Sequence, residues 1–429
     1  MIHSTHDVEH RSAASWTAYA SVAVMLALTC LVLSPRAAYA AEKEKEKGQQ
    51  ISRVIAKEMT AAQKALQAQQ WAEAIKNLEA AETKPGINAF DKKTIYDFKG
   101  FSYVKLNNMK EAEKAYEAAL ATGAYSSEDS AKTTRMLFRL TAGNQQYAKA
   151  AEYGKQVADS GAATADDLGI LSQIYYLQKD CKNSAVWADK AIAAARKAGE
   201  APKENLYQFK LQCASDAGDT PAMASTLLEL IRLTNKTTYW NTLLRIERQD
   251  EREDRNTLML YRVMYDTGSM TAGSDYIEMA QLLGDAALPA EAQTVLEKAM
   301  SGGLINDQQK ERTTRLLNSF KTRAEADKKG LTQLDAEANK SPAGELDVKL
   351  GEVYYGFGDY ANAVTATNRG IQKQQMKHPD EAYVYLGRAQ VALKNTADAK
   401  KAFAGLKSVP NISPRVLKLW ELYADTLGH

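Results

Sequence analysis

LGEVYYGFGDYANA, residues 350–363, is the stretch of sequence that decides the fold. The Gly358-Asp359 pair in its middle is a turn signal and separates two segments with helical character. Gly351 before the turn and Ala363 after it are small, which lets two helices approach closely where they cross. The stretch therefore predicts two packed helices joined by a short turn.

This stretch resembles the consensus of the tetratricopeptide repeat (TPR) family, from the first helix through the turn into the second. The same frame recurs at seven further places, marked by Trp71 and Ala74, Tyr96 and Ala112, Tyr147 and Ala150, Tyr175 and Ser184, Gly218 and Asp219, Tyr276 and Ala292, and Tyr383 and Ala399. Adjacent units are 34 to 39 residues apart. A single helix pair leaves one apolar face uncovered, so neighbouring units must stack. The resemblance implies an all-α, right-handed superhelical solenoid of helix-turn-helix repeats.

The repeat frame fails in two internal segments. Residues 235–270 predict an atypical helical joint between an N-terminal TPR superhelix at 50–234 and C-terminal repeats at 271–412, or else an irregular repeat. Residues 307–340 predict one long amphipathic helix within the C-terminal repeats.

The final segment, 413–429, predicts a capping helix. Ser413 is a favoured residue just before a helix, and Pro414 suits the first helical position. Apolar residues of this segment, Trp420 among them, would cover the open face of the last repeat.

The first 40 residues differ from the rest of the chain. Residues 16–33 carry no charge, and an Ala-x-Ala motif ends at Ala40, which predicts a signal peptide cleaved there. An uncleaved inner-membrane anchor is the alternative, because the apolar run approaches the length of a membrane span. Either outcome places the body outside the cytoplasm, and we expect the periplasm. Residues 41–49 alternate Glu with Lys and predict a charged tether.

Charge and composition weigh against several classes of function. The 55 basic and 53 acidic residues nearly cancel, to +2, so we expect no nucleic-acid partner, and membrane contact only through a retained N-terminus. Beyond the signal peptide only His378 and His429 remain, and the chain has no metal-binding or phosphate-loop motif. We therefore predict a protein that is not an enzyme and binds no metal or cofactor.

A run of charged residues and one histidine could belong to a catalytic site, but we consider another role more typical of each. The run from 245 to 255 includes carboxylates such as Glu247 and Glu251, which could act in pairs as acid and base. Interleaved arginines are more typical of a solvated helix face. His378, beside Pro379, is more typical of a solvated turn than of an active site.

The two cysteines of the body are Cys181 and Cys213. They fall on helices that should be adjacent and antiparallel, and an oxidising compartment permits a disulfide. We predict a Cys181–Cys213 disulfide, with two unrelated buried thiols as the alternative.

A TPR superhelix presents a concave groove lined by its first helices, and this groove is where a protein partner would bind. Residues on or beside first helices that are not core positions are candidate contacts: Asp97, Asn107, Asn108, Lys349 and Glu352. Tyr239 and Trp240 in the joint are aromatic candidates for partner binding. Burial within the joint is the alternative for this pair.

The export signal, the degenerate repeats and the Tyr239-Trp240-Asn241 joint together resemble periplasmic TPR proteins associated with TonB–ExbB–ExbD systems. This resemblance implies an accessory scaffold that helps couple an inner-membrane motor to outer-membrane uptake. The alternative is a general envelope scaffold, for example in outer-membrane protein assembly, polysaccharide export or recruitment of cell-wall enzymes.

Overall fold

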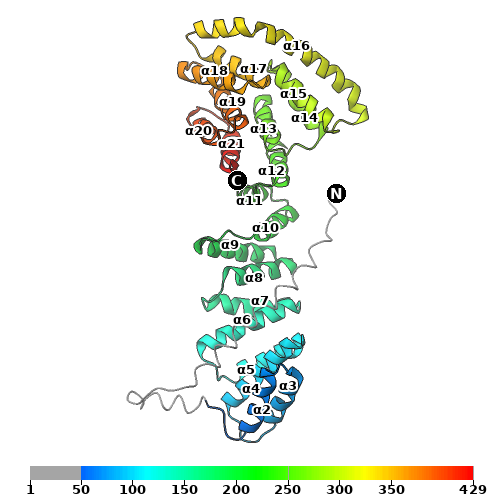
Figure 1. Cartoon of the computed structure of the whole chain (residues 1–429), viewed down its shortest axis with the longest axis vertical. Helices are drawn as coiled ribbons and strands as arrows, with labels where there is room; N and C mark the ends of the chain where they lie inside the picture. Colours follow the sequence, from blue (N-terminus) through cyan, green and yellow to red (C-terminus); the bar gives the residue numbers. More distant parts are fainter. Residues whose placement is uncertain (1–49, 250, 429) are drawn as a thin grey trace, which may run out of the picture. The chain divides into compact units, whose positions relative to one another are not determined.

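The computed structural model describes residues 50–249 and 251–428, and every regular element within these ranges is a helix. The all-α repeat fold expected from the sequence is confirmed (Figure 1). The signal peptide, its cleavage at Ala40 and the charged tether at 41–49 lie outside the described residues. In the described part of the chain, no helix combines the length and the apolar character needed to cross a bilayer.

The chain divides into two compact units between Leu140 and Thr141, inside a helix. The first unit contains α2 (Ala56–Gln67), α3 (Trp71–Glu82), α4 (Ala89–Lys105), α5 (Met109–Ala121) and most of α6 (Ser127–Gly143). The second unit continues with α7 (Tyr147–Asp159), α8 (Ala165–Leu177), α9 (Cys181–Lys197), α10 (Glu204–Asp216), α11 (Thr220–Thr234), α12 (Thr237–Gln249) and α13 (Asp254–Asp266). It ends with α14 (Gly273–Asp285), α15 (Pro289–Ser301), α16 (Asp307–Lys340), α17 (Glu345–Gly356), α18 (Tyr360–Lys373), α19 (Pro379–Ala392), α20 (Thr396–Gly405) and α21 (Pro414–Thr426). The expected joint at 235–270 therefore lies within the second unit and does not separate the two.

Several helix pairs share one kind of turn, in which a residue with positive φ precedes the residue that caps the next helix. Gly358 has a φ of 75°, and the side chain of Asp359 accepts a hydrogen bond from the amide of Asn362 at 3.3 Å. Asn107, with a φ of 57°, and Asn108 play the same parts before α5. A side-chain cap of this kind satisfies an amide that the helix itself cannot. The turn can therefore be short, and the paired helices lie side by side.

Small residues lie where paired helices cross. A Cβ atom on Gly351 would lie 2.1 Å from Oγ1 of Thr367 and 3.2 Å from the carbonyl oxygen of Ala363. Gly387 of α19 faces the ring of Phe403 in α20 at similarly short range. These glycines therefore set the distance between the helices of a pair.

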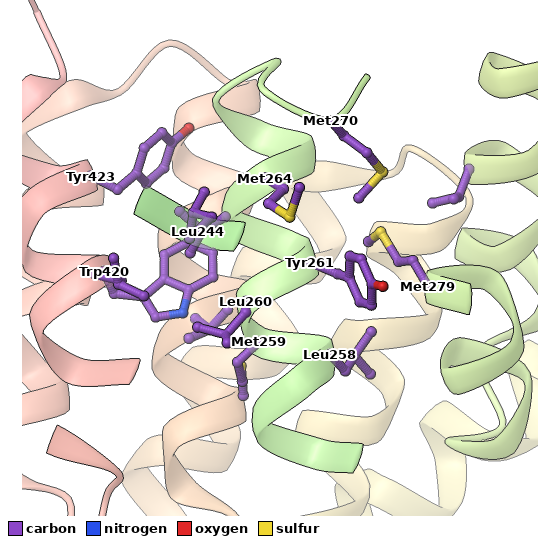
Figure 2. Close-up of a cluster of buried hydrophobic side chains, with 14 of the residues drawn as sticks. Leu244, Leu258, Met259, Leu260, Tyr261, Met264, Met270, Met279, Trp420 and Tyr423 are labelled. Carbon is purple, nitrogen blue, oxygen red and sulfur yellow. The ribbon is translucent and has the colours of Figure 1, made fainter. Parts of the chain in front are cut away.

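The irregular segment packs against the C-terminal helix in a buried apolar cluster. Figure 2 shows Leu260 of α13 beside Trp420 of α21. Trp420 is fully buried and also stacks on Phe403 of α20, with 5.1 Å between ring centroids. Arg415 of α21 binds Glu247 of α12 at 2.9 Å. The expectation that α21 covers the last repeat is therefore incomplete, because α21 also closes the second unit against α12 and α13.

The long helix expected near 307–340 is α16, which runs over two repeats of the second unit (Figure 1). Phe320 in its first half packs on Gly284 of α14, where an added Cβ would lie 2.6 Å from the ring. Near its end, the carbonyl of Ala338 accepts a hydrogen bond from Lys373 of α18 at 2.7 Å. α16 thus bridges the α14–α15 and α17–α18 pairs.

Candidate functional site

A cavity of about 480 Å³ lies in the second unit between α13, α14, α17 and α19. Three of these are first helices of their pairs, and the fourth, α13, belongs to the irregular segment. Lys349 and Glu352, two groove residues predicted from the sequence, both line this cavity. The structure thus brings them together with residues that the repeat pattern did not single out.

Carboxylates dominate the charged part of the cavity wall. They are Asp254, Asp285, Glu345, Glu352 and Glu381. The basic residues of the wall are Arg255, Lys349 and His378. Acidic groups outnumber basic ones, so the wall as a whole favours a positively charged ligand.

Both strongly basic side chains of the wall are engaged by the protein itself. Lys349 donates to Oε2 of Glu352 at 3.2 Å and to the carbonyl oxygen of Ala286 at 2.8 Å. Arg255 binds Oε1 of Glu381 at 3.0 Å and also pairs with Asp380. Both side chains are therefore paired with carboxylates of the protein, and little positive charge remains to bind an anionic ligand.

The carboxyl group of Glu352 is the most perturbed group of the wall. Its side chain is 4% exposed. Burial raises the pKa of Glu352 to about 7, although Lys349 opposes this, and the negative charge of Glu381 adds to the rise. Glu352 therefore exchanges its proton near neutral pH, unlike an ordinary carboxyl group.

A buried ionic network next to the cavity holds α13, α15 and α19 together. Arg388 donates to Oε1 of Glu291 at 2.7 Å and makes two hydrogen bonds to Asp266, at 2.8 and 3.1 Å. The hydroxyl of Tyr385 donates to the other oxygen of Glu291 at 2.6 Å and accepts from Arg262. Two arginines thus face two carboxylates away from water, and removing any one of the four would leave a buried charge without its partner.

The two carboxylates of this network differ in their environments. Burial raises the pKa of Asp266 in spite of the neighbouring Arg388. Burial also acts to raise the pKa of Glu291, but Arg388 and Arg262 outweigh it and hold this pKa below the ordinary value. The two arginines therefore favour the ionised form of Glu291 more strongly than burial disfavours it.

The charged run at 245–255 forms the predicted solvated face only in part: Arg245, Arg252, Glu253 and Asp254 are exposed, whereas other charged side chains of the run are partly buried in ion pairs. Arg248 binds Asp275 of α14 at 2.9 Å, and Arg255 reaches α19 as described above. Glu251 pairs with Arg415 of α21 at 3.6 Å. The prediction is wrong for Arg248, Glu251 and Arg255, because their partners lie far along the chain, where local spacing gives no sign of them.

His378 stands immediately before α19 and lines the cavity. It is exposed, as the solvated turn predicted for it requires, but its place on the cavity wall was missed. Sequence reasoning also missed Arg255 and Asp285. A signal was present for Asp285 alone, since an acidic residue at the C-terminal end of a helix is unfavourable for the helix dipole.

The predicted partner residues of the first unit have roles within that unit. Asp97 of α4 accepts a hydrogen bond from Tyr125 and pairs with Lys93 at 3.2 Å. Burial raises the pKa of Asp97, while Tyr125 and Lys93 oppose the rise. Asn107 forms the turn before α5 and Asn108 caps that helix. Contact of Asp97, Asn107 and Asn108 with a partner stays a prediction.

Trp240 is not available to a partner. Its side chain is 1% exposed, and the indole nitrogen donates to Oδ1 of Asn235 at 2.9 Å. The partner-binding prediction is therefore wrong for Trp240, and burial in the joint describes it. Tyr239 is partly buried, donates its hydroxyl to Glu204 and accepts from Gln208 at 3.0 Å. A contact between Tyr239 and a partner stays a prediction.

Cys181, the first residue of α9, is joined to Cys213 of α10 by a disulfide, with 5.5 Å between their Cα atoms. The bond ties the second helix of one pair to the first helix of the next. It closes a loop of 32 residues.

Among the residues described here, no group of three or more His, Cys, Asp or Glu side chains is arranged to hold a metal ion.

Helix pairs with capped turns and small residues at their crossings define the class of this chain: it is an all-α protein built from TPR-like helix-turn-helix repeats. No protein-family model matches the sequence, and no curated protein matches it.

Solved structures of TPR proteins are similar to this chain. A TPR protein from Parabacteroides merdae is 11% identical, with 86% of this chain and 99% of that chain covered and a TM-score of 0.33. The C-terminal part of a TPR protein from Cytophaga hutchinsonii is 11% identical over 75% and 97% of the two chains, with a TM-score of 0.32. The TPR domain of P58(IPK) is 12% identical over 87% and 99%, with a TM-score of 0.23. Because these scores are low, the class rests on the helix pairs themselves.

Proposed function

We propose that this chain is an exported, non-enzymatic scaffold that binds a partner protein through its second unit. The observation that carries the proposal is the charged cavity, which is lined mainly by first helices and contains two carboxylates, Asp254 and Asp285, that pair with no side chain among the described residues. Stacked helical repeats commonly use such surfaces to bind extended segments of other proteins.

We place the protein in the periplasm. The apolar segment followed by the Ala-x-Ala motif ending at Ala40 supports export. The Cys181–Cys213 disulfide supports it as well, because disulfides persist in oxidising compartments and are rare in the cytosol.

Within the periplasm, the sequence resemblance favours an accessory role in a TonB–ExbB–ExbD energy-transducing system. In this role the repeats bind one of the motor proteins or TonB itself. The alternative is a scaffold for envelope assembly, polysaccharide export or cell-wall enzymes. The two readings predict different partners for the same helical surface.

Affinity capture from detergent-solubilised envelopes tests the partner. The full-length chain with a C-terminal tag is the bait, and an unrelated periplasmic protein with the same tag is the control. Specific recovery of TonB-, ExbB- or ExbD-like proteins supports the first reading. Recovery of assembly, polysaccharide-export or cell-wall proteins supports the alternative, and recovery of no protein above the control contradicts the scaffold proposal.

Export is tested separately, by osmotic-shock fractionation and N-terminal sequencing of the tagged chain. We expect the protein in the periplasmic fraction, with residue 41 as its first residue. Retention in the membrane fraction with an intact N-terminus supports the anchor, and recovery in the cytosol contradicts export.

A further inference from the structure

We propose that Glu352 is a pH-sensitive switch in the wall of the cavity. With its proton bound, the side chain lets α17 pack closely against α19; once the proton is lost, this contact loosens and the cavity becomes easier to enter. The switch belongs to the free chain, so it operates whether or not the scaffold function proposed above is correct.

Glu352 lies where a buried position adjoins open space. The residue is 4% exposed, yet it lines the cavity of about 480 Å³ between α13, α14, α17 and α19. Close by, α17 contacts α19 through the rings of Tyr355 and Tyr385, whose centroids are 5.3 Å apart. A charge on Glu352 therefore forms away from water, where it is costly. The adjoining cavity is the space into which the side chain can turn to regain water.

Glu352 has few hydrogen-bond partners for a buried carboxylate, as a comparison with Glu291 of α15 shows. Both residues are 4% exposed. One oxygen of Glu291 accepts from Arg388 at 2.7 Å and the other from Tyr385 at 2.6 Å. The side chain of Glu352 accepts a single hydrogen bond from the described residues, from Lys349 to Oε2 at 3.2 Å. At equal burial, the carboxyl group with fewer donors is the one that retains a proton.

Lys349 compensates a charge on Glu352 only in part. Its ammonium group also donates to the carbonyl oxygen of Ala286 at 2.8 Å, and its charge also acts on Asp327 of α16. The side chain of Lys349 is 35% exposed, so water screens its charge. The positive charge nearest to Glu352 is therefore shared and screened.

Glu381 of α19 opposes a charge on Glu352. Arg255 pairs with Glu381 at 3.0 Å and with the neighbouring Asp380. Burial acts to raise the pKa of Glu381, but Arg262 and Arg255 outweigh it and hold this pKa below the ordinary value. Glu381 therefore favours its ionised form. Loss of the Glu352 proton then places a second negative charge in the same wall, and the repulsion acts between α17 and α19.

Other charged groups surround Glu352 on the remaining helices. On α18, Arg369 and Lys373 pair with Asp347 of α17 and not with Glu352. Histidines change charge near neutral pH, so His378 needs its own control. The other charged residues of the wall are Glu345 of α17, Asp254 of α13 and Asp285 of α14.

The direction of the pH effect follows from the proton. Burial raises the pKa of Glu352 to about 7, against the influence of Lys349 and with that of Glu381, whereas a solvated glutamate has the ordinary 4.5. The closed wall therefore binds the proton more tightly than the opened wall, and opening becomes easier as pH rises from 4.5 to about 7. Between pH 6 and pH 8 the equilibrium constant for local opening should rise about 10-fold.

Hydrogen exchange of the full chain, followed by mass spectrometry at pH 6 and pH 8, measures this opening. Each exchange rate is divided by the intrinsic rate of the same amide at that pH. We expect the opening constant to rise about 10-fold in peptides from α17 and from the start of α19. Peptides from α8 and α9 should show no rise, because the change is confined to the cavity wall.

Four variants assign the effect to Glu352. Glu352→Gln keeps the shape but cannot lose a proton, so the rise in α17 and α19 should disappear. The matched control Glu325→Gln, which removes an exposed carboxylate from α16, and His378→Gln should both keep the rise. Lys349→Gln removes the compensating charge and should enlarge the rise, which gives a second test that does not depend on the folding of Glu352→Gln.

Several outcomes would overturn the switch. They are no rise in wild-type α17, the same rise in Glu352→Gln, loss of the rise in His378→Gln, an unchanged rise in Lys349→Gln, or an equal rise in α8 and α9. None of these results bears on the scaffold function, which the envelope capture tests separately.

Discussion

Glu352→Gln should stabilise the protein at alkaline pH and change its stability little at acidic pH. The carboxyl group is almost completely buried and pairs with Lys349 of its own helix; the charges of Glu381 in α19 and Arg262 in α13 also act on it. Burial raises its pKa from the ordinary 4.5 to about 7. Glutamine has nearly the same shape and keeps an acceptor for Lys349, but it carries no charge at any pH.

The sign of the effect follows from proton binding. Between pH 4.5 and about 7 the folded protein holds the Glu352 proton and the unfolded chain does not. Stability contributed by this proton is therefore lost as pH rises through that range. A pKa rise of this size lowers the free energy of unfolding by about 3 kcal/mol between a pH well below 4.5 and a pH well above 7. Between pH 5 and pH 8 the advantage of the glutamine variant over wild type should grow by about 2 to 3 kcal/mol.

Urea unfolding followed by circular dichroism, at pH 5 and pH 8, measures this difference. Glu325→Gln, which removes an exposed carboxylate from α16, is the matched control and should track wild type at both pH values. A Glu352→Gln advantage that is the same at both pH values would refute the reasoning. So would a variant that is less stable than wild type at pH 8, since the ionised carboxylate would then be stabilising.

Three further changes test the packing. Gly351→Ala should lower the unfolding free energy by about 1 kcal/mol, because its Cβ would lie 2.1 Å from Oγ1 of Thr367 and this overpacking exceeds the gain in helix propensity. In a double-mutant cycle, Thr367→Ala in the same chain should recover at least half of this loss. Strict additivity of the two changes would contradict the contact. Trp420→Ala should cost about 3 to 5 kcal/mol, and hydrogen exchange should show lost protection in α13 as well as α20; loss confined to α20 would argue against closure of the second unit. Replacing Cys181 and Cys213 together by serine should cost about 3 to 4 kcal/mol, measured as a lower thermal midpoint that reducing agent no longer changes, whereas an unchanged midpoint would speak against a stabilising disulfide.

The helix pair is largely determined by the sequence alone. Gly358 and Asp359 are adjacent and both act locally. Gly358 turns the backbone through its positive φ, and the side chain of Asp359 caps the next helix at the amide of Asn362. Gly351 must be small wherever a second helix crosses the first. Such constraints are local and repeat along the chain, so the pattern predicts the helices, their turns and the long α16.

The candidate site was only partly predictable. Lys349 and Glu352 follow from their place on a first helix, since every first helix contributes to the same side of a repeat. Arg255 and Asp254 lie in a segment where the repeat frame fails, and nothing in their local pattern indicates that they face α19 across the cavity. For Trp240 the sequence suggested a site that the structure does not have. Tryptophan is common at interfaces, but this side chain is buried inside the second unit.

The tertiary structure alone decided that the second unit closes on itself. Trp420 packs beside Leu260, and Arg388 joins Asp266 to Glu291, in contacts between residues more than 90 positions apart. Periodicity describes what a helix presents to its neighbours along the chain, but it does not specify which distant helix will cover the last open face. That choice depends on the fit of apolar surfaces and on the pairing of buried charges, which exist only once the helices have packed.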